Sequence, residues 1–334
     1  MSGMSSPRSL ILAITLAASL LAACAKVDIP TEFPTPEPPP PATPIPHMEY
    51  KRDTELEKQF ETIAQAAKGK VGAAAVVLET GDAAFLNADG HYPMQSVYKL
   101  PIAMAMMDSI RRGEHALDEK VGVTPADYVR QGQASMLRDK NPNGGEFTIR
   151  ELIRLTLVES DGSASDILLR TLGGPQEVQS YIDQIGISDM HVLNTEKELG
   201  ANWQTQYENW ATPIAGVELL RWLDSSVGGW RPPNLDEDLA GGRIILQEMM
   251  ECNTGPNRIK GSLPNSYPRT VAHKTGTGGT QNGITSATND IGLIYSVDKR
   301  IAVAVFVSDS PADEKTREAV IAKIAKAAFD RWGK

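Results

Sequence analysis

The stretch DIGLIYSVDKRIAVAVFVSDS, residues 290–310, decides the fold class of this chain. Two parts of it, 290–296 and 301–308, are runs of apolar and β-branched residues that predict buried β-strands. A similar run over residues 270–275 predicts another strand just upstream. The C-terminal part of the chain therefore contributes several strands to one sheet.

Two more strands are predicted near the other end of the chain, over 71–79 and 83–86, as a hairpin. Between these two groups of strands, periodic apolar positions favour helices. The predicted helices are 53–69, 96–111, 148–159, 164–172, 176–185, 213–223, 239–252 and 311–332. We expect an α/β fold: an antiparallel five-stranded sheet from both termini, flanked by helices, with an all-α domain inserted over roughly residues 112–255.

The N-terminal region differs in composition from the rest of the chain. Arg8 and the apolar run 10–23 predict a secretory signal, since an apolar run of this length is too short to span a membrane. Nine of the 22 prolines lie between Pro30 and Pro46, which predicts an extended, semi-rigid spacer. The chain thus divides into a signal (1–23), a tether (24–47) and a folded domain (48–334).

Composition excludes several classes of protein. The formal net charge is -9, and no run of Lys and Arg is long enough to follow a phosphate backbone, so no nucleic-acid partner is expected. The two cysteines, Cys24 and Cys252, do not suggest a disulfide framework. No Cys/His cluster has zinc-binding spacing, so no metal site is expected.

The motif Ser96-Val97-Tyr98-Lys99 opens the helix predicted over 96–111. Residues i and i+3 share a helix face, so the Lys99 amine can reach the Ser96 hydroxyl and take its proton. The positive end of the helix dipole favours a developing alkoxide there. The same pattern recurs at Ser296-Val297-Asp298-Lys299 without a helix, so the motif alone is weak evidence.

Two further motifs strengthen the prediction. Ser160-Asp161-Gly162 lies between two predicted helices, and Lys274-Thr275-Gly276-Thr277 lies on a predicted strand. The order Ser-x-x-Lys, Ser-Asp-x and Lys-Thr-Gly is the signature of penicillin-interacting serine enzymes. In acyl transfer, Ser160 can relay a proton to the leaving nitrogen and Lys274 can supply positive charge. The strand after Lys274 can bind substrate and stabilise an oxyanion through its N–H groups.

With these motifs, residues 53–332 resemble the class A serine β-lactamases. The resemblance implies a β-lactamase/transpeptidase-like fold and hydrolysis of the β-lactam amide of penicillins and cephalosporins through a Ser96 acyl-enzyme, which confers resistance. It also implies that Glu196, in the loop 194–210, activates the deacylating water, and that no cofactor is needed. Two alternatives stay open: a DD-peptidase-like serine hydrolase, which does not need Glu196, and a non-catalytic lipoprotein that binds cell-wall fragments.

Other residues are similar to those of the PER/VEB-like extended-spectrum subgroup, among them Gln95 and the segments 166–170, 203–213 and 272–277. This resemblance implies that Asn194 and Asn209 replace the Arg–Asp ion pair at the ends of the loop. It also implies that Arg258 meets the substrate carboxylate, in place of an arginine at the position of Gly283.

Three small residues depart from the pattern of most class A enzymes. Gly162 stands where relatives carry an asparagine that contacts the lysine and the substrate amide. Gly200 stands where a loop asparagine helps to hold water, and Ala134 where an aromatic residue guards the site. We expect these changes to make the pocket roomier and tolerant of bulky substrates.

The sequence Leu21-Ala22-Ala23-Cys24 resembles the lipobox of bacterial lipoproteins. It implies a lipid on Cys24 and a protein exported to the periplasmic side and anchored to a membrane, the outer membrane of a Gram-negative bacterium. A monomer whose partner is a small β-lactam substrate is expected. Cys252 is interpreted as a structural free thiol.

Overall fold

A mixed β-sheet built from both ends of the chain forms the centre of the structure, a computed structural model that describes residues 40–229, 241–264 and 270–333. The strand order is β1-β3-β2-β12-β11-β10, and β9 also pairs with β11. The strands are β1 (Lys51–Arg52), β2 (Lys70–Val77), β3 (Asp82–Leu86), β9 (Val271–Thr277), β10 (Thr280–Gln281), β11 (Ile284–Tyr295) and β12 (Arg300–Ser310).

The five antiparallel strands that we expected are β3, β2, β12, β11 and β9. The expectation of a purely antiparallel five-stranded sheet was nevertheless incomplete. The two-residue strand β1 pairs in parallel with β3, and β10 extends the sheet beside β11. The sheet gains β1 because the segment that leads into the first helix runs alongside β3, where the Lys51 N–H donates to the Gly81 carbonyl over 2.8 Å.

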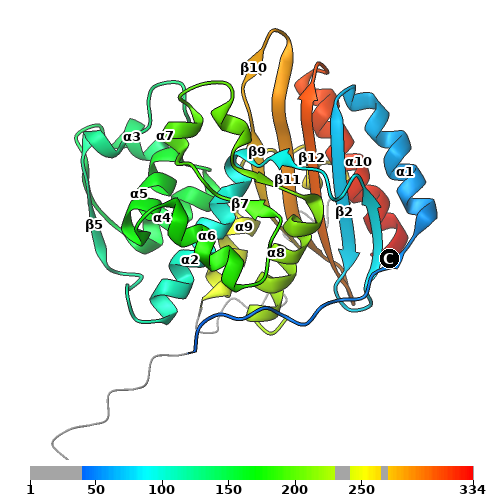
Figure 1. The fold of residues 1–334 in the computed structure, drawn as a ribbon, viewed down its shortest axis with the longest axis horizontal. Helices are drawn as coiled ribbons and strands as arrows, with labels where there is room; N and C mark the ends of the chain where they lie inside the picture. Colours follow the sequence, from blue (N-terminus) through cyan, green and yellow to red (C-terminus); the bar gives the residue numbers. More distant parts are fainter. Residues whose placement is uncertain (1–39, 230–240, 265–269, 334) are drawn as a thin grey trace, which may run out of the picture. The chain divides into compact units, whose positions relative to one another are not determined.

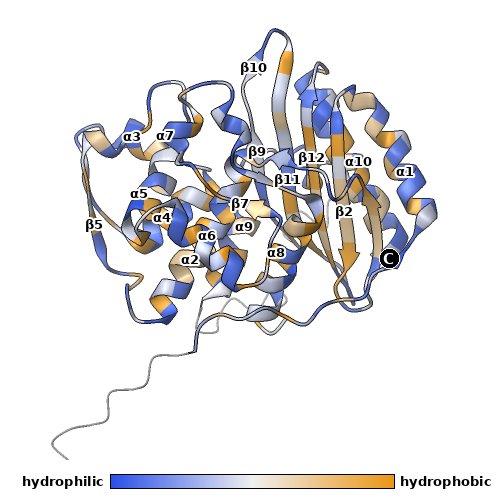
Figure 2. Ribbon diagram, in the orientation of Figure 1, coloured by the Kyte–Doolittle hydropathy of each residue, from blue (hydrophilic) through white to orange (hydrophobic). Residues whose placement is uncertain are grey.

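The stretch 290–310 forms the hairpin β11–β12, in which Tyr295 pairs with Arg300. Side chains alternate between the faces of a strand, so β12 contributes to two hydrophobic cores. Ala302, Ala304 and Phe306 belong to the core shared with the helical part, and their neighbours Ile301, Val303, Val305 and Val307 to the core on the opposite face. The hydrophobic residues of these strands are coloured orange in Figure 2.

Helices α1 (Thr54–Ala64) and α10 (Glu314–Trp332) cover one face of the sheet (Figure 1). Asp53 caps α1 by accepting a hydrogen bond from the Leu56 N–H over 3.1 Å. Leu56 and Phe60 of α1 share a core with Phe329 of α10.

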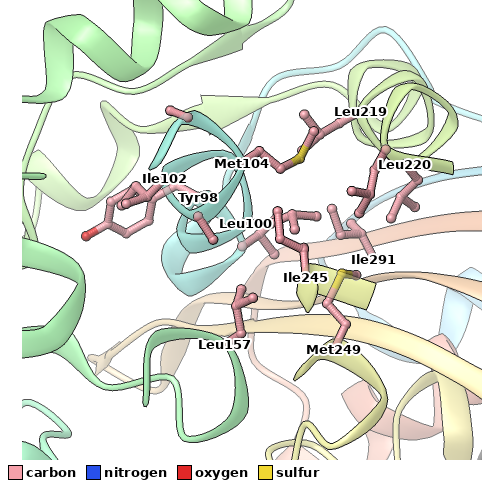
Figure 3. Packing of buried hydrophobic residues seen from close by; sticks show 14 of the residues in the cluster. Tyr98, Leu100, Ile102, Met104, Leu157, Leu219, Leu220, Ile245, Met249 and Ile291 are labelled. Carbon is pink, nitrogen blue, oxygen red and sulfur yellow. The ribbon is translucent and has the colours of Figure 1, made fainter. Parts of the chain in front are cut away.

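The helical part lies against the other face of the sheet (Figure 1). Its helices are α2 (Lys99–Arg111), α3 (Met136–Lys140), α4 (Ile149–Val158), α5 (Gly162–Leu172), α6 (Pro175–Gln184), α8 (Pro213–Ser226) and α9 (Gly242–Met250). Helix α2 is buried among them, and Figure 3 shows its Leu100 and Met104 near residues of α8, α9 and β11. This burial fixes the helix that begins beside Ser96.

The inserted part is not purely helical. It contains a small sheet of β5 (Lys120–Val123) and β6 (Gly145–Thr148). A further small sheet joins β4 (Tyr92–Pro93), β8 (Trp210–Ala211) and β7 (Met190–His191). Two-residue strands such as β7 and β8 carry too few residues for a periodic pattern.

Residues 40–47, called the strap below, lie against the helical part. The Arg111 Nη1 donates to the Pro40 carbonyl over 2.6 Å, and the Trp222 Nε1 to the Thr43 carbonyl over 2.9 Å. The predicted signal, Cys24 and most of the predicted tether lie outside the described residues. The strap itself was assigned to that tether, but it packs on the folded body. Within the described ranges, no helix is both long and apolar enough to cross a membrane.

Candidate active site

The three motifs meet in a cleft of ≈ 690 Å³ between the helical part and the edge of the sheet. Its walls include Ser96, Lys99, Ser160, Glu196, Thr275 and Thr277. Residues that are far apart in the chain are therefore neighbours here, as the motif order predicted.

Ser96 lies in a 3-10 turn, Gln95–Tyr98, that leads directly into α2. The Nζ atom of Lys99 donates to the Ser96 Oγ over 3.0 Å and to the Ser160 carbonyl over 2.7 Å. Lys99 is buried, and Gln95 has a φ of +48°, a conformation that is costly for a residue with a side chain. The packed start of α2 thus holds the Ser96 hydroxyl against an amine.

Ser160 and Lys274 form the second contact of the site. The Lys274 Nζ donates to the Ser160 Oγ over 2.9 Å. Ser160 has a φ of +56°, and Asp161 caps the following helix α5 through the Ala164 N–H, 2.9 Å away. Burial, together with the charge of Lys99, lowers the pKa of Lys274 to about 8. The ammonium of Lys274, whose pKa is lowered, therefore holds the Ser160 hydroxyl, which faces the cleft.

Glu196 begins the short helix α7 (Glu196–Leu199), so the segment 194–210 is not entirely a loop. The Glu196 Oε2 lies 3.3 Å from the Lys99 Nζ and accepts a hydrogen bond from the Tyr98 hydroxyl over 3.2 Å. Glu198, two residues on, instead accepts hydrogen bonds from Thr195 in a capping box. Glu196 is thus the carboxylate that enters the cleft.

Two residues that support Glu196 were missed by the sequence analysis. The Asp166 carboxylate accepts hydrogen bonds from the N–H of Glu196 (2.6 Å) and of Lys197 (3.1 Å). Burial raises the pKa of Asp166 to about 7. The signal that could have found Asp166 is an acidic residue inside the otherwise apolar pattern of α5. Tyr98 lay inside the Ser-x-x-Lys motif but was given no role.

The two ends of the loop are joined by Asn209, which is fully buried. Its Oδ1 accepts from the N–H groups of Leu193 (2.8 Å) and Asn194 (2.9 Å), and its Nδ2 donates to the Asn194 carbonyl over 2.9 Å. In place of the Arg–Asp ion pair that the resemblance associates with the loop ends, the side-chain amide of Asn209 therefore binds backbone groups. The Asn194 side chain turns to Glu208 instead.

The glycines at 162 and 200 do not leave empty space. A Cβ atom at position 162 would lie 2.8 Å from the Glu196 Cγ and 3.2 Å from the Ala134 carbonyl oxygen. A Cβ atom at position 200 would lie within 2.5 to 2.9 Å of the side-chain amide of Gln133. The expectation of a roomier pocket is wrong at these two points, because Glu196 and Gln133 occupy the space.

Arg258 is only 2% exposed and lies behind strand β9. Its Nη2 donates to the Thr277 Oγ1 over 2.7 Å, its Nη1 to the Gly276 carbonyl over 3.1 Å, and its Nε pairs with Glu318 over 3.1 Å. That Arg258 meets the substrate carboxylate stays a prediction from the resemblance. The guanidinium supports Thr277, and Thr277 is the residue that faces the cleft.

His273 and Cys252 contribute to the structure behind the cleft. The His273 Nδ1 lies 2.9 Å from the Asp290 carboxylate in the buried interior. Cys252 is a buried free thiol. In the part of the chain that the structure describes, no group of three or more His, Cys, Asp or Glu side chains could hold a metal ion.

Comparison with known proteins adds to this geometry. Residues 55–332 match the model of the β-lactamase enzyme family. The chain belongs to this family. It is 35% identical to the β-lactamase VEB-1 of Pseudomonas aeruginosa over 83% of this chain and 90% of that protein. It is 34% identical to the extended-spectrum β-lactamase PER-1 of the same organism, over 82% of this chain and 86% of that protein.

Solved β-lactamase structures agree with this assignment. The crystal structure of a β-lactamase from Chitinophaga pinensis matches with a TM-score of 0.77 and 35% identity, over 83% of this chain and 99% of that one. The TLA-3 extended-spectrum β-lactamase also matches with a TM-score of 0.77, at 37% identity over 84% of this chain and 99% of the other. The protein is a class A β-lactamase, a hydrolase that opens β-lactams and confers resistance to them.

Proposed function

We propose that this β-lactamase hydrolyses penicillins and cephalosporins through an acyl-enzyme on Ser96. The observation that carries the proposal is the placement of both Ser96 Oγ and Glu196 Oε2 beside the Lys99 Nζ atom, at 3.0 and 3.3 Å. One buried amine thus links a nucleophile with a carboxylate that can activate water. The DD-peptidase alternative gives no role to that carboxylate.

In acylation, the Ser96 Oγ attacks the lactam carbonyl, and its proton passes to Lys99 or, through water, to Glu196. The backbone N–H groups of Ser96 and Thr277 stabilise the oxyanion. As the C–N bond breaks, Ser160 gives its proton to the lactam nitrogen, and the proton taken from Ser96 is relayed to Ser160 in its place. Lys274 supports this step, since its ammonium already donates to the Ser160 Oγ.

In deacylation, Glu196 takes a proton from water, and the water oxygen bonds to the acyl carbon. The bond from that carbon to the Ser96 Oγ then breaks, and the proton returns to Ser96. Asp166 and Tyr98 keep Glu196 in place, because one binds its backbone N–H and the other its carboxylate.

Substitution of Ser96 tests this proposal, and the chain carries its own matched control. Ser96→Ala is expected to abolish both nitrocefin turnover and the covalent adduct detected by mass spectrometry. Ser296→Ala alters the second Ser-x-x-Lys motif, which lies at the β11–β12 turn, and should turn over nitrocefin at the wild-type rate. An adduct that persists in Ser96→Ala would overturn the assignment of the nucleophile.

We also propose that the enzyme accepts bulky cephalosporins. Support comes from the ≈ 690 Å³ cleft and from relatives that carry the name extended-spectrum β-lactamase. A comparison of kcat/KM for a small penicillin and an oxyimino-cephalosporin tests this. A kcat/KM for the oxyimino-cephalosporin that is more than about a hundredfold lower than for the penicillin, or roughly 3 kcal/mol, would contradict the proposal.

For localisation, we propose export and lipid attachment at Cys24, with a monomeric enzyme on the periplasmic side of the membrane. The support is the apolar run that ends in Leu-Ala-Ala-Cys and the proline-rich segment that follows it. Cys24→Ser should move the enzyme from the membrane fraction to the soluble fraction. Unchanged partitioning would contradict lipid attachment.

A further inference from the structure

The side-chain amide of Gln133 fills the space above Gly200, beside the general base. Three of its atoms lie within 2.5 to 2.9 Å of the position that a Cβ atom of residue 200 would take. The backbone of Gly200 has φ -79° and ψ -9°, which any residue can adopt. Nothing in the backbone therefore requires glycine at 200, and the neighbouring amide is what occupies the site.

The hydrogen bonds of Gln133 fix the orientation of its amide. Its Nε2 donates to the backbone carbonyl of Glu196, so its Oε1 points the other way. That Oε1 is buried and has no hydrogen-bond partner among the described residues. An unsatisfied buried carbonyl costs about 1–3 kcal/mol, and such groups in proteins are usually paired with ordered water. Gln133 is also one of the residues that line the cleft.

The carboxylate of Glu196 is similarly oriented. Both Tyr98 and Lys99 contact its Oε2, at 3.2 and 3.3 Å. The two side chains thus hold one oxygen of the carboxylate and leave the other for a reactant. Gln133 binds the backbone carbonyl of this same residue and, like Glu196, lines the cleft.

We propose that Gln133 positions the water molecule that hydrolyses the acyl-enzyme. The proposal rests on the deacylating role of Glu196 given above and adds the second acceptor that this water needs. The water donates one hydrogen to the Gln133 Oε1 and the other to the Glu196 carboxylate, so that a lone pair of its oxygen faces the Ser96 ester. Gln133 is a positioning residue, since it aims the water and takes no proton.

Removal of the amide should slow deacylation and leave acylation unchanged. In rapid-quench experiments with nitrocefin, Gln133→Ala is expected to deacylate roughly ten times more slowly, which corresponds to one lost hydrogen bond. The acyl-enzyme should accumulate in mass spectra, with an unchanged acylation burst. Gln133→Leu keeps the bulk of the side chain and should behave alike. The exposed Gln131→Ala is the matched control and should match the wild type.

The double variant Gln133→Ala/Gly200→Asn separates water placement from a structural role. An asparagine at 200 puts an amide into the same space from the opposite side, so it should restore most of the deacylation rate. A hydrogen bond that only fixed the Glu196 backbone would not be restored in this way.

Three results would overturn the proposal: a wild-type deacylation rate in Gln133→Ala and Gln133→Leu, an equal loss of acylation and deacylation, or a double variant as slow as Gln133→Ala. The Glu196→Gln variant in the same assay tests the underlying mechanism separately. If that variant turns over nitrocefin at the wild-type rate, the proposed deacylating role of Glu196 is wrong, independently of the results for the Gln133 variants.

Discussion

A Cβ atom on residue 162 and the Cγ atom of Glu196 would be separated by 2.8 Å, closer than real side chains approach each other. A side chain at 162 and the observed position of Glu196 therefore exclude each other. Gly162→Asn, the residue that the resemblance associates with most class A enzymes, is expected to displace Glu196 and lower the deacylation rate at least about tenfold. Single-turnover kinetics measure this rate directly.

The control for this substitution is Gly122→Asn. A Cβ atom at position 122 would meet no atom within 4 Å, so the same chemical change should leave turnover unaltered. A Gly162→Asn enzyme with wild-type deacylation would mean that the loop around Glu196 adjusts freely.

The pH profile of kcat/KM should show an alkaline limb from Lys274. Burial lowers the pKa of this lysine to about 8, so its ammonium loses a proton as the pH rises through that value. The positive charge at the Ser160 Oγ is then lost and activity falls. Lys274→Arg stays protonated at these pH values, so its limb should move to higher pH.

The exposed Lys140→Arg serves as the control for this profile and should leave the limb in place. If the limb stayed near pH 8 in Lys274→Arg, another group would be responsible for it.

Arg258→Ala should weaken both substrate binding and stability. Thr277 loses its 2.7 Å partner, so the KM for carboxylate-bearing lactams should rise. The mostly buried Glu318 loses its cation, which costs on the order of 3 kcal/mol of unfolding free energy. Urea unfolding measures the second effect. Arg258→Lys keeps the positive charge but not the hydrogen bonds of the guanidinium, so it separates the two contributions. An unchanged KM in Arg258→Ala would confine Arg258 to a structural role.

The strap should contribute to stability but not to catalysis. A chain that begins at residue 48 lacks the carbonyls of Pro40, Ala42, Thr43 and Pro46, which accept hydrogen bonds from the helical part. We expect a loss of about 1 kcal/mol for each such hydrogen bond, relative to a chain that begins at residue 40. Nitrocefin kcat should be equal in both chains. Equal denaturant midpoints would show that the strap adds no stability.

Much of this fold is predictable from sequence, because strands such as β11 and β12 are long enough to show a pattern. The two-residue strands β1 and β10 are too short for that. Strand β1 pairs with β3, where Lys51 lies opposite Asp82, whereas β10 pairs with the start of β11 across the turn at Asn282 and Gly283. Helix α7 also escaped detection, although the Thr195 and Glu198 capping box is a local signal for its start.

Some features of the candidate site were likewise predictable from the sequence, and others were not. Ser96, Lys99, Ser160 and Lys274 stand in motifs whose spacing reflects their chemistry, so their meeting in one cleft was predictable. The orientation of Arg258 was not, because Arg258 lies in a turn outside the strands, and only tertiary packing decides which groups its guanidinium binds. Gln133 lies in a segment without periodicity, and its contact with Glu196 exists only in the folded chain.

The strap also has a consequence for the order of folding. Its donors Arg111, Gln184 and Trp222 come 71, 142 and 179 residues later in the chain than the carbonyls that they bind. The part of the domain that is synthesised first can therefore dock only after most of the chain is present and the helices have formed. Contacts of such long range are slow to form, so docking of the strap is expected to be a late kinetic phase in refolding.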